Sequence, residues 1–296
     1  MLTLTLIEIA VMVLVPIVAV VVLAARRKGP DGSVGPTLVL VAVGTATFAA
    51  SQILHIPLNL LAQKLGRGLS LNPSFVVVAL LLGLSAGVCE EWARYVGLRM
   101  VHRRRPAWLT RSGGIAHGLG HGGVESIALG GLVALTLLGM LSIRGASPEQ
   151  LMAMGVPEAQ VGEVVEQARA YWATYWPLPL FGGLERVMTI VAHVAFSVLV
   201  CRAVATGESR WVWLAVVWHA ALDAAAVYVT QVHGIVIAEG IVFTNAVLAF
   251  GVLRNMPAFG AEAEADADAD ADADAEPEAV ADAEAEAEAV AVAEAE

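Results

Sequence analysis

The sequence predicts an all-α membrane protein, a polytopic helical bundle of about seven transmembrane helices with an outer amphipathic segment and a disordered acidic C-terminal tail. Two observations lead to this prediction. Hydrophobic residues make up 58% of the 296 residues and the mean hydropathy is +0.72, which is typical of polytopic membrane proteins and not of soluble domains. The chain also repeats apolar runs of about 20 residues or more, each long enough to cross a bilayer.

Hydropathy and helix-breaking residues place the spans in order along the chain. The first run has its basic residues after it, the reverse of a cleaved signal peptide, so it is predicted to be the first span. The two cysteines, Cys89 and Cys201, fall within spans and are too few for a disulfide framework. We expect the seven spans at about residues 3–25, 37–62, 75–101, 115–143, 180–204, 211–231 and 234–254.

Two segments are expected to lie outside the bilayer. The connection 144–176 opens with Ser147-Pro148-Glu149, a helix-start pattern, and its acidic and aromatic residues predict an amphipathic helix, as a lid over a cavity or as a plain linker. Beyond Gly260, Ala alternates with Asp or Glu, and 15 of the 28 acidic residues lie there, so this tail is predicted to be disordered. We therefore expect a transmembrane domain at 1–256 and a tail at 257–296.

Basic residues in the connections predict the orientation, because the cytoplasmic side carries an excess of Lys and Arg. One face has ten such residues and the other has four. The ten are Arg26, Arg27, Lys28, Arg103, Arg104, Arg105, Arg111, Arg202, Arg210 and Arg254, and the four are Lys64, Arg67, Arg144 and Arg169. This count predicts a multi-pass plasma-membrane protein with its N-terminus outside and its C-terminus in the cytoplasm.

The third predicted span carries three charged residues, Glu90, Glu91 and Arg94. Charges inside a bilayer cost roughly 2.5–3.5 kcal/mol each on insertion scales, so such residues indicate a functional site by default. Their spacings, i,i+4 and i,i+3, place all three on one helix face, where they can partly neutralise one another. The alternative is a purely structural ion-pair clamp between helices.

The fourth span opens with a second polar motif. His117, His121 and Glu125 are four residues apart and line one helix face. The glycines between them allow a neighbouring helix to approach closely; they are Gly118, Gly120, Gly122 and Gly123. This pattern predicts one wall of a polar site, or alternatively a packing seam with hydrogen-bonded histidines.

The fifth and sixth spans add two more motifs. Glu185 and Arg186 lie near the outer end of the fifth span, and His193 follows Arg186 by two helical turns on one face. His219 and Asp223 are at i,i+4 in the sixth span, where the carboxylate can set the tautomer of the imidazole ring.

Three kinds of chemistry can be built from these residues. A carboxylate can activate water while histidines stabilise the oxyanion, which gives peptide hydrolysis. Zinc could instead be bound by His121, His193 and His219, although the chain lacks a His-Glu-x-x-His motif. A proton-coupled carrier could use the same polar cavity, although no internal repeat is evident, and a non-catalytic membrane protein remains the fourth alternative.

The four motifs, in this order on successive spans, resemble the YhfC family of glutamic-type intramembrane proteases, related to the PrsW proteases and the CAAX-processing (CPBP) endopeptidases. The resemblance covers residues 1–256. It implies a metal-independent hydrolase without a cofactor, in which Glu90 activates water with help from His193, and Glu91 and Arg94 position that base. It further implies that His219 with Asp223 holds the oxyanion.

Two positions depart from the CAAX-type pattern. Glu125 stands where that pattern has a histidine, which leaves open whether His121 or His193 assists Glu90. Asp223 stands where that pattern has an asparagine, and because a carboxylate cannot donate a hydrogen bond, we expect Asp223 to orient His219. The expected partners are the lipid bilayer and a peptide or membrane-protein substrate, with no nucleic acid.

Overall fold

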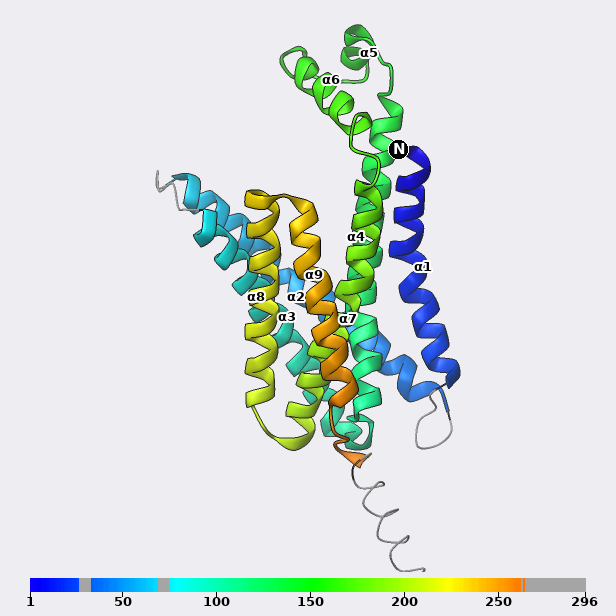
Figure 1. Cartoon of the computed structure of the whole chain (residues 1–296), viewed down its shortest axis with the longest axis vertical. Helices are drawn as coiled ribbons and strands as arrows, with labels where there is room; N and C mark the ends of the chain where they lie inside the picture. The colour runs from blue at the N-terminus through cyan, green and yellow to red at the C-terminus, as the bar shows by residue number, and fades with distance from the viewer. Residues whose placement is uncertain (27–32, 69–74, 262, 264–296) are drawn as a thin grey trace, which may run out of the picture.

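A computed structural model of the chain describes residues 1–26, 33–68, 75–261 and 263, and within these ranges it contains helices and no strand. Seven of the described helices are long and apolar enough to cross a membrane. They are α1 (Leu2–Arg26), α2 (Gly35–Gly68), α3 (Phe75–Arg104), α4 (Arg111–Ser142), α7 (Leu178–Thr206), α8 (Arg210–His233) and α9 (Ile235–Asn255) (Figure 1). The predicted fold class and all seven spans are therefore confirmed.

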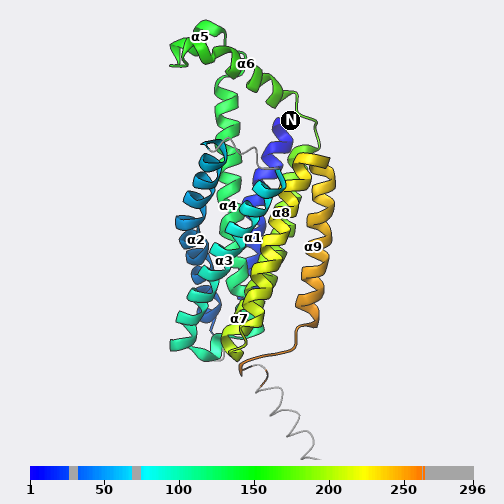
Figure 2. The same ribbon diagram turned by 90° about the vertical axis from the view of Figure 1, so that its left-hand side faces the viewer.

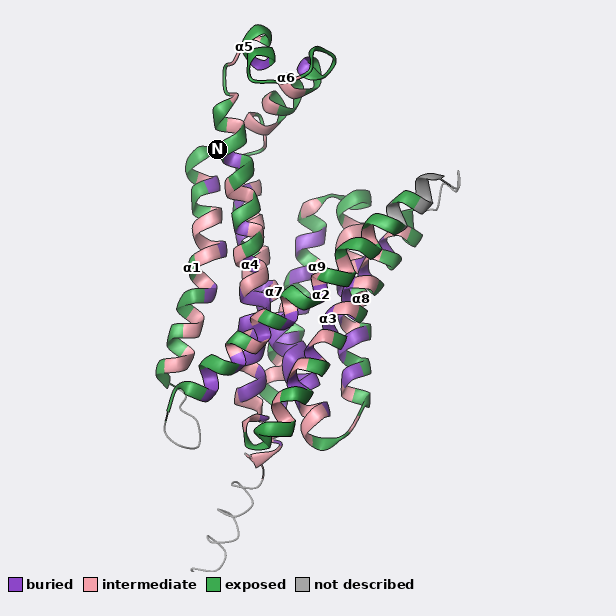
Figure 3. Ribbon diagram, turned by 180° about the vertical axis from the view of Figure 1, so that it is seen from behind, coloured by how far each residue is buried: buried purple, intermediate pink, exposed green. Residues whose placement is uncertain are grey.

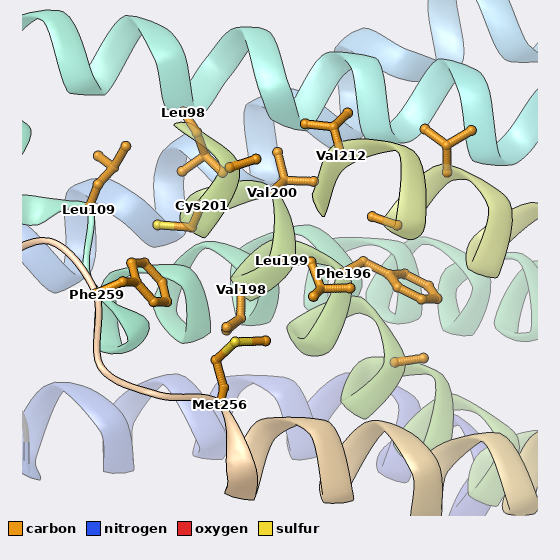
Figure 4. Packing of buried hydrophobic residues seen from close by; sticks show 14 of the residues in the cluster. Leu98, Leu109, Phe196, Val198, Leu199, Val200, Cys201, Val212, Met256 and Phe259 are labelled. Atoms are coloured by element: carbon orange, nitrogen blue, oxygen red, sulfur yellow. The ribbon is translucent and has the colours of Figure 1, made fainter. Parts of the chain in front are cut away.

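Helix α7 is the central helix of the bundle. It contacts α1, α3, α4, α8 and α9, and Figure 2 shows α2 and α9 at opposite edges of the bundle. The side chains from Phe196 to Cys201 are fully enclosed. Figure 3 shows the buried parts of the ribbon concentrated around α7, and Figure 4 shows the hydrophobic side chains packed there. Because this stretch is apolar apart from Ser197, it forms the core on which the polar residues of neighbouring helices are placed.

The packed body continues past the end of α9. Met256 and Phe259 are buried in the same hydrophobic cluster as Val198 and Leu199 (Figure 4). Packing against the core therefore continues through Phe259, while the domain boundary at 256 stays a prediction. The acidic tail from residue 264 onward lies outside the described residues, as do Arg27 and Lys28 of the orientation count.

The outer segment forms two helices where one was predicted. Ser147 caps α5 (Pro148–Ala153) through a capping box with Gln150, as the helix-start pattern indicated. The chain then breaks at Gly155, whose φ of +94° favours glycine, and α6 (Glu158–Trp172) follows. Both helices project beyond the bundle at the end where the N-terminus lies (Figure 1).

Close helix packing depends on the glycines of α4. A Cβ atom at Gly120 would lie 2.0 Å from the backbone oxygen of Val41 in α2, whereas one at Gly131 in the same helix would meet nothing within 4 Å. The predicted small-residue seam therefore faces three helices: Gly120 faces α2, Gly118 and Gly122 face α7, and Gly123 faces α1. The close approach at Gly120 allows α2 to reach the polar site.

We expect Gly120→Ala to destabilise the protein by about 1–3 kcal/mol, because the added methyl group must force two backbones apart in a packed interior. Gly131→Ala serves as the matched control and should leave stability unchanged or slightly raised. Thermal unfolding of the purified proteins in one detergent checks this. Equal melting temperatures for Gly120→Ala and wild type would show that the α2–α4 contact is not under steric constraint.

Candidate functional site

The charged residues of α3 meet at the centre of the bundle. Glu90, Glu91 and Arg94 are each no more than 4% exposed. The Nε atom of Arg94 lies 3.2 Å from Glu91 Oε1, and Nη2 lies 3.7 Å from Glu90 Oε2. The prediction that the three share a face and offset one another's charge is therefore confirmed. One guanidinium therefore faces two carboxyl groups, and it can balance the charge of only one of them.

Arg94 also joins α3 to α7. Its Nη1 atom donates to the backbone oxygen of His193 at 2.9 Å and to Ser197 Oγ at 2.8 Å. Its Nη2 atom donates to His193 Nδ1 at 2.6 Å. Because a guanidinium has no acceptor, each of these partners must receive the hydrogen bond. Arg94 therefore fixes the direction of every hydrogen-bond chain that begins at it.

The first chain runs from Arg94 toward α2. Since Ser197 Oγ accepts from Arg94, its own proton is free for His117 Nδ1, which lies 3.1 Å away. His117 then carries its proton on Nε2 and donates to Thr47 Oγ1 at 3.3 Å. His117 is fully buried, and in this tautomer both of its ring nitrogens have a hydrogen-bond partner, as buried polar groups require.

The same chain ends on Glu90. Thr47 Oγ1 lies 3.1 Å from His121 Nδ1 and 2.8 Å from the backbone oxygen of Gly44, so its proton can go to either acceptor. His121 Nε2 lies 3.1 Å from Glu90 Oε2. A carboxylate at Glu90 requires a proton on that nitrogen, which selects Thr47 as donor to Nδ1. In this arrangement every group accepts one hydrogen bond and donates one, and Glu90 is the final acceptor.

The other oxygen of Glu90 faces α2. Gln52 Nε2 donates to Glu90 Oε1 at 3.4 Å, and His55 Nδ1 lies 3.9 Å from the same oxygen. Gln52 of α2 therefore contacts one oxygen of Glu90 and His121 of α4 contacts the other, and no described residue donates to both.

A second, shorter path runs from Arg94 through His193 and ends in an ion-pair contact with Glu125. Because Arg94 donates to His193 Nδ1, the His193 proton lies on Nε2, which is 2.7 Å from Glu125 Oε2. The other oxygen of Glu125 accepts from Arg186 Nη1 at 3.0 Å, and Arg186 also pairs with Glu185. The residues of the fourth and fifth spans are thus brought together, with Arg186 satisfied by two carboxylates.

His219 lies between α3 and its own helix, α8. Its Nδ1 atom lies 2.7 Å from Glu91 Oε1, whereas its Nε2 atom is 3.6 Å from Asp223 Oδ2 and 3.9 Å from Glu90 Oε2. The ring stacks on Phe196, with centroids 4.8 Å apart. Glu91, and not Asp223 as we expected, therefore makes the short hydrogen bond that orients His219. The i,i+4 spacing places Asp223 near the other nitrogen, with its side chain 38% exposed.

These side chains surround a cavity of about 70 Å³. Its polar wall includes Glu90, Glu125, His193, His219 and Asp223. This volume is enough for one or two waters, and the wall offers both carboxylate acceptors and imidazole donors. The arrangement can therefore hold a water against Glu90 with His219 Nε2 on the other side.

The structure places His121 rather than His193 in hydrogen-bond contact with Glu90. His193 lies in the same cavity, but its Nε2 atom makes a close ion-pair contact with Glu125. Four further residues of the site were not among the predicted ones: Thr47, Gln52, His55 and Ser197. Helical spacing could have pointed to two of them, because Thr47 and His55, together with Ser51, recur every four residues on one face of the second span.

The donor atoms also allow a test of metal binding. Glu90, His193 and His219 offer ligand atoms that all lie within 4.8 Å of one another. However, a histidine ligand needs a free lone pair, and the Nδ1 lone pair of His193 is taken by Arg94 while its Nε2 proton faces Glu125. His121 uses both nitrogens in the same way. Of the three predicted zinc ligands only His219 retains a nitrogen without a close partner among the described residues, so this donor set does not fit zinc.

Comparisons with known proteins agree with the motifs. A family model described as YhfC intramembrane metalloprotease matches residues 11–242, a range that contains every predicted site residue. An "Uncharacterized membrane protein YhfC" from Bacillus subtilis (strain 168) is 31% identical over 145 residues, covering 49% of this chain and 54% of that protein. The chain thus spans about half the length of this curated relative. No solved structure matches.

Proposed function

The chain belongs to the YhfC intramembrane metalloprotease family, and from this premise we propose that it is an intramembrane endopeptidase in which Glu90 activates the water that hydrolyses a peptide bond. The substrate is a peptide or a membrane-associated protein. The observation that carries the proposal is the end of the Arg94 hydrogen-bond chain, where His121 donates to Glu90 at the wall of a water-sized cavity.

In the proposed mechanism, a water in the cavity gives a proton to Glu90, and the resulting hydroxide attacks the carbonyl carbon of the substrate. The carbonyl oxygen becomes an oxyanion, which His219 stabilises by donating from Nε2. Glu91, 2.7 Å from Nδ1, balances the charge of a doubly protonated ring. Collapse of the intermediate breaks the C–N bond, and Glu90 returns its proton to the leaving nitrogen.

The remaining residues hold this geometry. His121 and Gln52 fix the two oxygens of Glu90, and Arg94 sets the tautomers of His117, His121 and His193. Glu125 and Arg186 fix the far side of His193. Preorganisation of this kind lowers the barrier because the donors need not reorient during the reaction.

We expect hydrolysis to persist in excess EDTA, and we expect the purified protein to contain no stoichiometric zinc. The family description names a metalloprotease, but the tautomers of His121 and His193 leave too few lone pairs for a zinc site. Metal analysis of the purified protein, with activity measured before and after chelation, checks both points. Activity lost in EDTA and restored by zinc would instead favour a zinc protease that uses these histidines in other tautomers.

The proposed activity is tested by comparing membrane proteomes from cells that carry wild-type protein or Glu90→Gln. New peptide termini that appear only with wild-type protein identify substrates. If no terminus depends on Glu90, while the variant is present at equal levels, the peptidase proposal fails and a carrier or non-catalytic role takes its place.

We further propose a plasma-membrane location with the N-terminus outside, on the basis of the excess of basic residues at the opposite end.

A further inference from the structure

A second cavity lies at the opposite end of the bundle from α5 and α6. It has a volume of about 460 Å³ and lies between α3, the end of α7 and the start of α8. None of the peptidase site residues lines it. Its walls combine aromatic, aliphatic and basic side chains, chiefly Trp92, Trp213, Val216, Arg99, His102 and Arg103.

Within the described residues, the basic side chains of this groove lack acidic partners. Arg99 and Arg103 are one helical turn apart on α3. Arg99 donates to Tyr95 at 2.5 Å, and His102 Nδ1 is buried without a hydrogen-bond partner in the same part of the chain. By contrast, Arg210 at this end of the bundle is paired with Glu208. The groove is therefore a positive site that is complementary to an anion.

The apolar part of the groove matches a lipid tail. Trp92 and Trp213 are 60% and 63% exposed along its wall. From Val88 to Arg99 the helix advances 11 residues, or about 16 Å at 1.5 Å per residue. One leaflet of a hydrocarbon core is about 15 Å thick. An acyl chain lying beside Val88 would thus bring its headgroup to the level of Arg99 and Arg103.

We propose that this groove binds an anionic phospholipid, with the headgroup phosphate against Arg99, His102 and Arg103 and an acyl chain along Trp92 and Trp213. Arginine suits the phosphate because its planar donors can contact two oxygens at once. Tryptophan suits the boundary between headgroup and tail because its ring is apolar and its N–H is polar. The proposal rests on the groove alone and does not depend on the peptidase activity.

Native mass spectrometry of the full-length protein in detergent tests the proposal, with phosphatidylglycerol, phosphatidylcholine or glycerol 3-phosphate added. We expect phosphatidylglycerol to bind in preference to phosphatidylcholine and to resist competition by glycerol 3-phosphate. In Arg99→Gln/Arg103→Gln protein its affinity should fall about 25-fold, from about fivefold per basic residue removed. Arg104→Gln, an exposed residue of the same helix that does not line the groove, is the matched control and should change affinity less than about twofold.

Equal losses in Arg104→Gln and in the double variant would overturn the proposal, because binding would then reflect overall charge. Displacement by glycerol 3-phosphate would show a free phosphate site and would also overturn it.

A second measurement leaves the basic residues in place. Phosphatidylglycerol with brominated chains should quench tryptophan emission more than brominated phosphatidylcholine, and Trp92→Phe/Trp213→Phe should abolish that difference. A difference that persists in this variant places the lipid elsewhere.

Discussion

Glu90→Gln is expected to reduce the rate of peptide hydrolysis by about 10²–10⁴-fold, the usual contribution of a positioned general base. The amide has the size of the carboxylate but cannot take a proton from water. The effect is measured as kcat on a substrate identified from the membrane proteome, with purified wild-type and variant proteins in the same detergent. Protein stability should change little, because the amide oxygen of the substituted side chain would still accept a hydrogen bond from His121.

Glu166→Gln is the matched control for this prediction. Glu166 lies on α6 and pairs with Arg169 at the surface, so its loss should leave kcat unchanged. The proposed role of Glu90 would be wrong if Glu90→Gln kept more than about a tenth of the wild-type rate. A loss of less than about tenfold is smaller than the contribution of a positioned general base. Such a result would move attention to Glu125, the other glutamate in the cavity that lies in close contact with a histidine.

Arg94→Met is expected to cost about 3–5 kcal/mol of stability, the range seen when one partner of a buried ion pair is removed. The variant leaves Glu91 fully buried beside His219 without its guanidinium, and it removes three hydrogen bonds that join α3 to α7. Thermal unfolding in detergent measures the loss. Arg94→Lys should recover only part of it, because an ammonium group cannot reproduce the forked contacts to His193 and Ser197.

A double variant separates charge from packing. In Glu91→Gln/Arg94→Met protein the uncompensated carboxylate is gone, so the double variant should be more stable than Arg94→Met alone. Additive losses in the two substitutions would contradict the view that Arg94 mainly balances buried negative charge. In either case, activity should fall with Arg94→Met, since His117, His121 and His193 lose the donor that fixes their tautomers.

Much of the site could be predicted because it depends on local spacing. Glu90, Glu91 and Arg94 meet as their i,i+3 and i,i+4 separations require. The glycines of α4 allow the close approach that their small size predicted, although the helices they admit, α1, α2 and α7, were not foreseen. The single outer helix was wrong in one respect, since Gly155 and Pro157 divide it into α5 and α6.

The pairings between helices could not be predicted in the same way. His193 and His121 both have polar neighbours at helical spacing on their own helices, and only the packing of α3 against α4 and α7 decides that His121 faces Glu90 and His193 faces Glu125. Asp223 has the right spacing for His219, but Glu91 from another helix lies closer to the ring.

By itself, the sequence determined the number and approximate limits of the spans and which residues share each helix face, because hydropathy and helical periodicity are properties of neighbouring residues. The tertiary structure alone decided which face meets which, and hence the direction of the hydrogen-bond chains from Arg94. That choice depends on the rotation and depth of whole helices, which are set by packing between segments far apart in the chain: Thr47, Glu90, His121 and His193 come from four different helices.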